Sequence, residues 1–196
     1  AEETARIRSD VSKYNIGLIV VDSLGPAFGN PNDPELVICG MNALASFGKA
    51  SRLVISHVAK ADMDKNSGSP YGSVYVRNMA RSVWELRGTT DPDDSNEIAI
   101  AVYHRKANNS KLYSPIGFKI IFSDEKIDIA YHDISESPEL IRKSPVTYQI
   151  LKQLKNIPLD ARLTSQEIAL QLEISENTAR GTLNRELKKN RVTRID

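Results

Sequence analysis

Four polar residues that follow apolar segments have the clearest capacity for chemistry in this chain. Asp22 and Ser23 end one apolar run, and His57 and Lys60 follow another. A carboxylate placed in this way can orient a water molecule on Mg²⁺ beside a nucleotide phosphate. An imidazole can hydrogen-bond a terminal phosphate, and a lysine can add positive charge there. The two motifs together therefore predict a phosphate-handling site.

Each of these residues also has a plainer interpretation. An aspartate at the end of a strand often caps a loop, and Ser23 fits a turn, with metal contact as the second possibility. A lone histidine at such a position is more often structural than functional. His104 and His132 have no partner at a suitable spacing, so we expect them to be structural or surface residues.

The two apolar runs predict the elements that would bring these residues together. Residues 16–21 predict a buried central strand of a parallel sheet, residues 34–48 a helix, and residues 53–56 the next strand. The carboxyl ends of parallel strands meet at one edge, where open α/β folds bind ligands, so Asp22 and His57 are expected one strand apart. Further elements predicted are a helix over 2–14, a short helix over 74–79, strands over 82–86 and 98–103, and an edge hairpin over 118–131.

This order of elements predicts an α/β fold with two domains. Residues 1–133 would form a mostly parallel sheet with an edge β-hairpin, and residues 134–145 a linker. After Pro145 the apolar spacing becomes helical, and two helices, a tight turn and a third helix precede a short strand over 192–195. Residues 146–196 therefore predict a small winged helix-turn-helix domain.

Charge and composition narrow the classes of protein. The 196 residues carry a formal net charge of +1. From residue 138 onward there are 11 Lys/Arg against 7 Asp/Glu, so the basic excess lies in the carboxyl-terminal part. The single cysteine, Cys39, excludes an internal disulfide and indicates a reducing, cytoplasmic setting. No apolar run approaches the roughly 18 residues that span a membrane.

The third helix of the tail, residues 176–189, is the predicted recognition helix. Ser175 would cap it, and Ala179, Leu183 and Leu187 would form its buried face. Thr164 and Glu167 predict a capping box for the preceding helix. A winged helix can also bind proteins instead of DNA. The residues expected to contact DNA bases or phosphates are Asn177, Thr178, Arg180, Asn184, Arg185, Lys188 and Lys189, with Arg191 and Arg194 around the wing.

Four blocks in order give this chain a resemblance to a known group. The blocks IGLIVVDSLGPAFG, LVISHVAKAD, YGSVYVRNMARSVWEL and HRKANNSKLYSPIGF resemble the RecA-like ATPases of the AAA type related to the RepA hexameric replicative helicases. The resemblance covers about residues 1–131. It implies a DNA-handling ATPase of the kind found on plasmids, phages and integrated elements. The implied cofactors are ATP and Mg²⁺, and the implied assembly is a homo-oligomeric ring, such as a hexamer, that acts on DNA.

The resemblance also implies roles for individual residues. Asp22 would be the Walker B carboxylate that holds the metal, and His57 would sense the phosphate. In related helicases a basic finger reaches the ATP of the next subunit, and Lys106, with Arg105 second, occupies the equivalent block here. The other residues implied to shape the nucleotide pocket or the central channel are Gly72, Ser73, Arg81 and Asn108.

One departure from the group is decisive for activity. A G-x-x-x-x-G-K-[ST] motif, whose amides and lysine cradle phosphates, is absent from the sequence. The segment most similar to this motif, around Gly48 and Lys49, lies between the two predicted strands. Gly48 is expected to cap a helix. The P-loop would then lie upstream of Ala1, and this chain would be the carboxyl-terminal part of an ATPase, inactive by itself. The alternative is a non-enzymatic DNA-binding or regulatory protein that keeps a degenerate ATPase scaffold.

Overall fold

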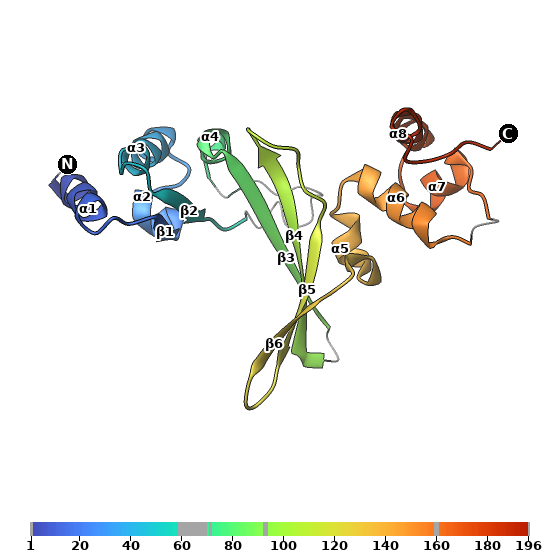
Figure 1. The fold of residues 1–196 in the computed structure, drawn as a ribbon, viewed down its shortest axis with the longest axis horizontal. Helices are drawn as coiled ribbons and strands as arrows, with labels where there is room; N and C mark the ends of the chain where they lie inside the picture. Colours follow the sequence, from blue (N-terminus) through green and yellow to red (C-terminus); the bar gives the residue numbers. More distant parts are fainter. Residues whose placement is uncertain (1, 59–69, 71, 92–93, 159–160, 196) are drawn as a thin grey trace. The chain divides into compact units, whose positions relative to one another are not determined.

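The computed structural model describes residues 2–58, 70, 72–91, 94–158 and 161–195 (Figure 1). The chain divides into two compact units. The first comprises residues 1–83 and 105–112, and the second comprises residues 84–104 and 113–196. In the part of the chain that is described, no helix combines the length and the apolar character needed to cross a membrane.

The first unit is built around a parallel pair of strands. Strands β1 and β2 pair in parallel from Leu18 opposite Ser51 to Asp22 opposite Ile55, which confirms the predicted strand–helix–strand arrangement. A parallel pair needs a crossover connection, and here helices supply it. The elements of this unit are α1 (Glu2–Lys13), β1 (Leu18–Asp22), α2 (Leu24–Phe28), α3 (Pro34–Ala45), β2 (Ser51–Ile55) and α4 (Val74–Met79).

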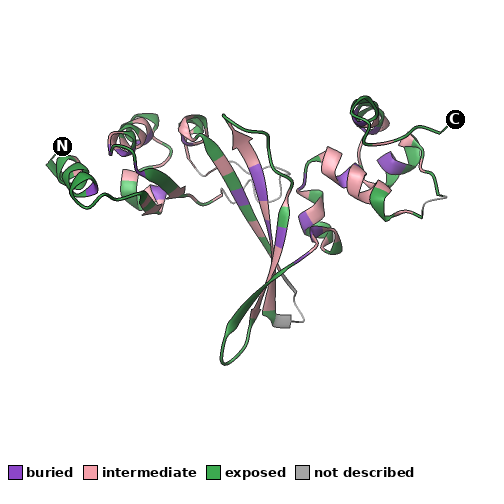
Figure 2. Cartoon of the chain, in the orientation of Figure 1, coloured by how far each residue is buried: buried purple, intermediate pink, exposed green. Residues whose placement is uncertain are grey.

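Only one face of this parallel pair is covered. Ile19, Val21 and Val54 pack on a core that includes Leu44 and Phe47. The alternate residues of the two strands, Leu18, Val20, Leu53 and Ile55, are 40% to 54% exposed (Figure 2). The prediction of a fully buried central strand is therefore wrong for this chain, because among the described residues no second layer lies on that face.

Capping interactions define the limits of α3. The Asp33 side chain accepts hydrogen bonds from the backbone N–H groups of Glu35 and Leu36, and Pro34 occupies the first turn. At the other end, the Arg52 guanidinium donates to the carbonyls of Leu44, Ala45 and Gly48. The helix ends at Ala45 with Ser46 as its cap, so Gly48, at φ +73°, lies in the turn beyond and is not itself the predicted cap.

The second unit contains most of a four-stranded antiparallel sheet in the order β3-β4-β5-β6. The predicted edge hairpin is confirmed by β5 and β6, with Phe118 opposite Tyr131 and Phe122 opposite Ile127. The expectation of a mostly parallel sheet is wrong for the described strands, because β4 and β5 also pair antiparallel. No helix lies in the described residues between these two strands to supply the crossover that parallel pairing needs. The strands are β3 (Ser82–Asp91), β4 (Asp94–Ala107), β5 (Ile116–Phe122) and β6 (Ile127–Tyr131).

One face of this sheet carries the segment that was predicted to be a linker. Ala101 and Tyr103 on β4 pack against Ile134 and Leu140. The Tyr103 hydroxyl also donates a hydrogen bond of 2.5 Å to the Leu140 carbonyl. Residues 134–145 therefore form folded structure, η2 (Ile134–Glu136) and α5 (Pro138–Arg142), because their apolar side chains are needed to cover the sheet.

The opposite face of the antiparallel sheet carries apolar side chains, and these are exposed at its β6 edge. Direct pairing puts Ile98, Ile120 and Ile129 on one face across three strands. The side chains of Ile129 and Tyr131 at the β6 edge are 68% and 76% exposed (Figure 2). An apolar face of this extent is typical of a packing or binding surface.

Three helices form the carboxyl-terminal part of the second unit: α6 (Val146–Asn156), α7 (Ser165–Gln171) and α8 (Glu176–Lys188). Ile150, Ile168, Ala169 and Ala179 are at the centre of their core. These helices confirm the predicted helical periodicity and the predicted order of the three helices.

Two details of the predicted winged domain are wrong. Residues 192–195 form no strand, because the described residues around them offer no strand with which their backbone could pair. On α8, Thr182 and Glu186 are buried together with Ala179, while Leu187 is 36% exposed. The helix is therefore rotated relative to the face predicted from its leucines.

Candidate nucleotide and nucleic-acid sites

A small cavity lies at the carboxyl ends of β1 and β2. Asp22 is opposite Ile55 in the strand register, and His57 follows two residues later. The cavity holds about 180 Å³ and is lined by Ser23, Leu24, Gly25, Pro26, Pro31, Ser56 and His57. The structure thus brings Ser23 and His57 to one cavity, while Asp22 and His57 are both exposed to solvent. Ser56 directly precedes His57 in the same short motif, and Pro31 is among the lining residues that the sequence analysis missed.

Gly72 and Ser73 adjoin the wall of this cavity through Pro31. The Ser73 N–H donates a hydrogen bond of 2.6 Å to the Pro31 carbonyl. A Cβ atom on Gly72 would lie 2.2 Å from the same oxygen, and the φ of this glycine is +112°. Ser73 also caps α4 by accepting a hydrogen bond from the Tyr75 N–H. Only glycine permits this close approach, so the sequence Gly72-Ser73 fixes α4 against the loop that lines the cavity.

Lys106 has a structural contact that the sequence analysis did not anticipate. Its ammonium donates to the carbonyls of Arg77, Asn78 and Ala80 at 2.9, 2.8 and 2.7 Å. These carbonyls lie at the carboxyl end of α4, where a cation also complements the helix dipole. Lys106 therefore uses its three donors within its own unit.

The remaining predicted nucleotide residues lie near the same helix end or outside the described residues. The backbone N–H of Asn108 donates to the Arg81 carbonyl at 2.9 Å, which joins the start of β3 to the loop after β4. The side chains of Asn108 and Arg81 are exposed, and the side chain of Arg105 is half-buried. Lys60 lies outside the residues that the structure describes.

The Asp22 position fits a magnesium site of the kind completed by a nucleotide. Mg²⁺ in such sites keeps several waters and takes one or two carboxylates together with phosphate oxygens. The Asp22 carboxylate is exposed at the sheet edge and can accept such a metal-bound water. Among the described residues there is no group of three or more His, Cys, Asp and Glu side chains placed to hold a metal ion.

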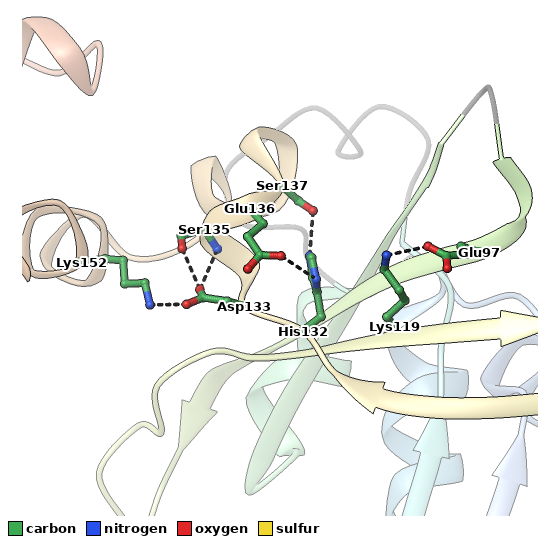
Figure 3. A network of polar contacts seen from close by, with 8 residues as sticks. All are labelled: Glu97, Lys119, His132, Asp133, Ser135, Glu136, Ser137 and Lys152. Atoms are coloured by element: carbon green, nitrogen blue, oxygen red, sulfur yellow. Dashed lines mark hydrogen bonds and ion pairs between the residues drawn. The ribbon is translucent and has the colours of Figure 1, made fainter. Parts of the chain in front are cut away.

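The two other histidines are structural, as the sequence analysis expected. The buried His104 ring stacks on Trp84 with a centroid separation of 4.1 Å, and its Nδ1 accepts a hydrogen bond from the Tyr113 N–H. His132 is also buried and contacts the Ser137 hydroxyl at 3.0 Å (Figure 3). Both rings are used for packing and local hydrogen bonding.

A polar network fixes α6 to the segment before η2 (Figure 3). The Asp133 carboxylate accepts hydrogen bonds from the Lys152 ammonium and from the backbone and hydroxyl of Ser135. These donors, Lys152 first, lower the pKa of Asp133 to about 2, and the same contact raises the pKa of Lys152. The network therefore has a structural role, because it holds α6 against the residues that precede η2.

The predicted DNA-contacting residues all lie on the surface. Ser175 caps α8 by accepting a hydrogen bond from the Thr178 N–H at 3.1 Å, as predicted. Arg180 pairs with Glu176 one turn earlier at 2.5 Å. The exposed residues of the predicted set are Asn177, Thr178, Arg180, Asn184, Arg185, Lys188, Lys189, Arg191 and Arg194. The helix and the residues after it therefore carry an exposed set of cations and hydrogen-bonding side chains.

Glu186 gives two of these cations a second role. Its carboxylate is buried and lies 2.8 Å from the Lys189 ammonium and 3.1 Å from the Arg191 guanidinium. The hydrogen bond from Lys189 is the main reason that the pKa of Glu186 is lowered. Lys189 and Arg191 thus hold the residues after α8, and no sequence signal marked Glu186 as buried.

The geometry defines a mixed α/β protein with a small parallel sheet, an antiparallel sheet and a three-helix carboxyl-terminal bundle. Comparison of the chain with protein-family models and with curated protein sequences finds no match. The site residues must therefore be interpreted from their own geometry.

Proposed function

We propose that this chain is the carboxyl-terminal part of a cytoplasmic, DNA-handling ATPase of the RepA-like replicative helicase or replication-initiation type, carrying a helix-turn-helix domain. One observation carries the proposal. Ser23 and His57 line a single cavity at the carboxyl ends of two parallel strands, and Asp22 ends the first of them. Ligands of open α/β folds bind at this edge.

The proposed roles follow from the positions of the side chains. Asp22 would hold a water on Mg²⁺, and His57 would hydrogen-bond the terminal phosphate of ATP. The metal, when bound, supplies charge neutralisation to the phosphates. ATP would bind between the subunits of a ring. Lys106, the candidate for a cation acting on a neighbouring subunit, would first have to leave the three α4 carbonyls that it contacts.

The open face of the parallel pair also supports the proposal. Leu18, Val20 and Leu53 on that face are 52% to 54% exposed. Parallel sheets are ordinarily covered on both faces. A phosphate-binding strand and its helix, contributed by a further part of the ATPase, would extend this sheet, cover its apolar face and supply the missing P-loop.

The test is the Asp22→Asn substitution in the full-length protein. The amide keeps the size of the side chain and removes its charge, so ATP turnover should fall by at least about a hundredfold while folding is unchanged. Asp10→Asn, on the exposed surface of α1, is the matched control. Retention of normal turnover by the Asp22 variant would overturn the assignment.

A second candidate function is a non-enzymatic DNA-binding or regulatory protein that keeps an ATPase scaffold. It is favoured by the exposed cationic surface of α8 and by the absence of a phosphate-loop motif from this sequence. The two functions separate in a DNA-binding assay on the full-length protein with and without ATP and Mg²⁺. Nucleotide-dependent DNA binding supports the ATPase, and nucleotide-independent binding without any turnover supports the regulator.

A further inference from the structure

Helix α7 directs one large apolar side chain away from the core of its own bundle. Ile168 and Ala169 are buried in that core. The next residue, Leu170, is 81% exposed, more than any other large apolar side chain in the described part of the chain. Leu170 therefore contributes almost nothing to packing within the bundle, and its side chain is available for a contact from outside it.

Leu170 lies in a shallow groove of about 630 Å³. The groove is lined by Gln166, Glu167, Ala169, Leu170, Glu173 and Ile174, which belong to α7 and to the turn before α8. Its apolar floor and its size suit a few side chains of a bound segment, since ligand pockets of proteins hold about 300 to 1,000 Å³.

The charges at the groove distinguish between classes of partner. Glu167 and Glu173 both line it, and no Lys or Arg does. Two carboxylates repel phosphate groups and attract cations. The exposed cationic surface of the same bundle lies instead on α8, with Arg180, Arg185 and Lys188. The bundle thus separates a surface suited to nucleic acid from a groove that is unsuited to it.

A cation already contacts the rim of the groove. The Arg142 guanidinium of α5 lies 3.4 Å from the Glu173 carboxylate, and the two side chains are 66% and 72% exposed. Ion pairs this exposed contribute little stability, so an incoming cation can replace Arg142 easily. The chemistry that the groove accepts is therefore an apolar side chain flanked by a Lys or Arg.

From these observations we infer that the α7 groove is a docking site for a basic amphipathic segment of a partner protein. An apolar side chain of that segment packs on Leu170 and Ile174, and its cations pair with Glu173 and Glu167. This is the helix-in-groove mode of recognition. The inference goes beyond the proposed function and does not depend on ATP hydrolysis.

The test titrates the 196-residue chain, labelled with ¹⁵N, with a synthetic helical peptide. The peptide has about 14 residues, with leucines spaced i, i+4 and lysines on both sides of them. We expect amide shifts confined to α7 and to residues 173–174, with α8 unmoved. Leu170→Asn and Glu173→Lys should each weaken binding by about tenfold. Leu187→Asn, at an exposed leucine of α8, is the matched control and should leave binding unchanged.

Several results would overturn the inference. The first is the absence of chemical-shift changes at the groove amides with millimolar peptide. The second is equal binding of a peptide that has glutamates in place of the lysines. The third is an unaltered peptide affinity of both groove variants. Shifts of the groove amides on addition of duplex DNA would mean that the groove takes nucleic acid. Shifts that grow with protein concentration alone would mean that it takes a second copy of the chain. Because Leu170 and Glu173 are exposed, both variants should melt like the native chain.

Discussion

The ammonium of Lys152 in α6 lies 2.5 Å from the carboxylate of Asp133, the residue that precedes η2. Residues 134–145, which lie between them in the sequence, were expected to be a linker, but they make further contacts with the sheet. Leu140 is buried against the sheet and accepts a hydrogen bond from the Tyr103 hydroxyl. The helical bundle is therefore fastened to the antiparallel sheet through residues 133–142 and belongs to one compact unit with it.

The Asp133–Lys152 contact predicts a specific acid dependence of stability. The pKa of Asp133 is about 2 in the folded chain, against an ordinary value of 3.8. Its contribution is therefore present above about pH 4 and is lost as the pH falls through about 2. Asp133→Asn should lower the free energy of unfolding at pH 7 by about 1 to 2 kcal/mol, with a smaller difference from the native chain at pH 2.5, as measured by urea unfolding.

The matched control for this pair is Asp128→Asn. Asp128 and Lys126 lie 2.9 Å apart, but their side chains are 50% and 68% exposed. The control should change the free energy of unfolding by less than about 0.5 kcal/mol. Equal stability of the Asp133 variant and the native chain at pH 7 would show that the pair does not tie α6 to the sheet.

Lys106→Met tests whether this lysine holds α4 or serves a nucleotide. The variant removes three hydrogen bonds to helix-end carbonyls, so we expect a loss of about 2 kcal/mol in the free energy of unfolding. Lys111→Met, at an exposed position in the loop after β4, should be neutral. A full-length Lys106 variant that melts normally but loses ATP turnover would contradict the structural role and support the role in the neighbouring site.

Gly117→Ala tests the packing of β5 on the residues that follow β6. A Cβ at Gly117 would lie 2.2 Å from the His132 carbonyl oxygen and 2.5 Å from a methyl carbon of Ile134. Since backbone must move to admit it, thermal melting should show destabilisation by about 3 kcal/mol. At Gly17 an added Cβ would meet nothing within 4 Å, so Gly17→Ala is the control. Similar melting of both variants would refute the close approach.

Lys188→Ala tests DNA contact by α8 without disturbing the Glu186 ion pairs. The variant should weaken duplex binding at low salt, and the slope of log affinity against log salt should fall by about 1 for the lost phosphate contact. Arg142→Ala removes an equal charge from the exposed surface of α5 and should leave the slope unchanged. An unaltered slope in the Lys188 variant would exclude this residue from the DNA interface.

Local signals in the sequence were enough to predict most elements and some of the site. The helix over 74–79, the hairpin over 118–131 and the third helix of the tail, over 176–189, were predicted with nearly the observed bounds. The two helices before it were predicted in their observed order. The capping box of Thr164 and Glu167 is present as predicted. The strand register also confirms that Asp22 and His57 lie at the same edge of the parallel pair. Each of these features depends on residues close in sequence or on the general rule for parallel strands.

What the sequence determined by itself was therefore periodicity, capping and the edge at which the polar residues gather. Only the tertiary structure decided that residues 192–195 form no strand. It also decided that Lys106 donates hydrogen bonds to the carboxyl end of α4 and that Glu186 is buried beside Lys189 and Arg191. The physical reason is that a strand, a helix-end cation and a buried carboxylate each require a partner brought close by folding. The periodic pattern of a sequence determines local secondary structure, whereas the packing of distant segments determines which partners these groups meet.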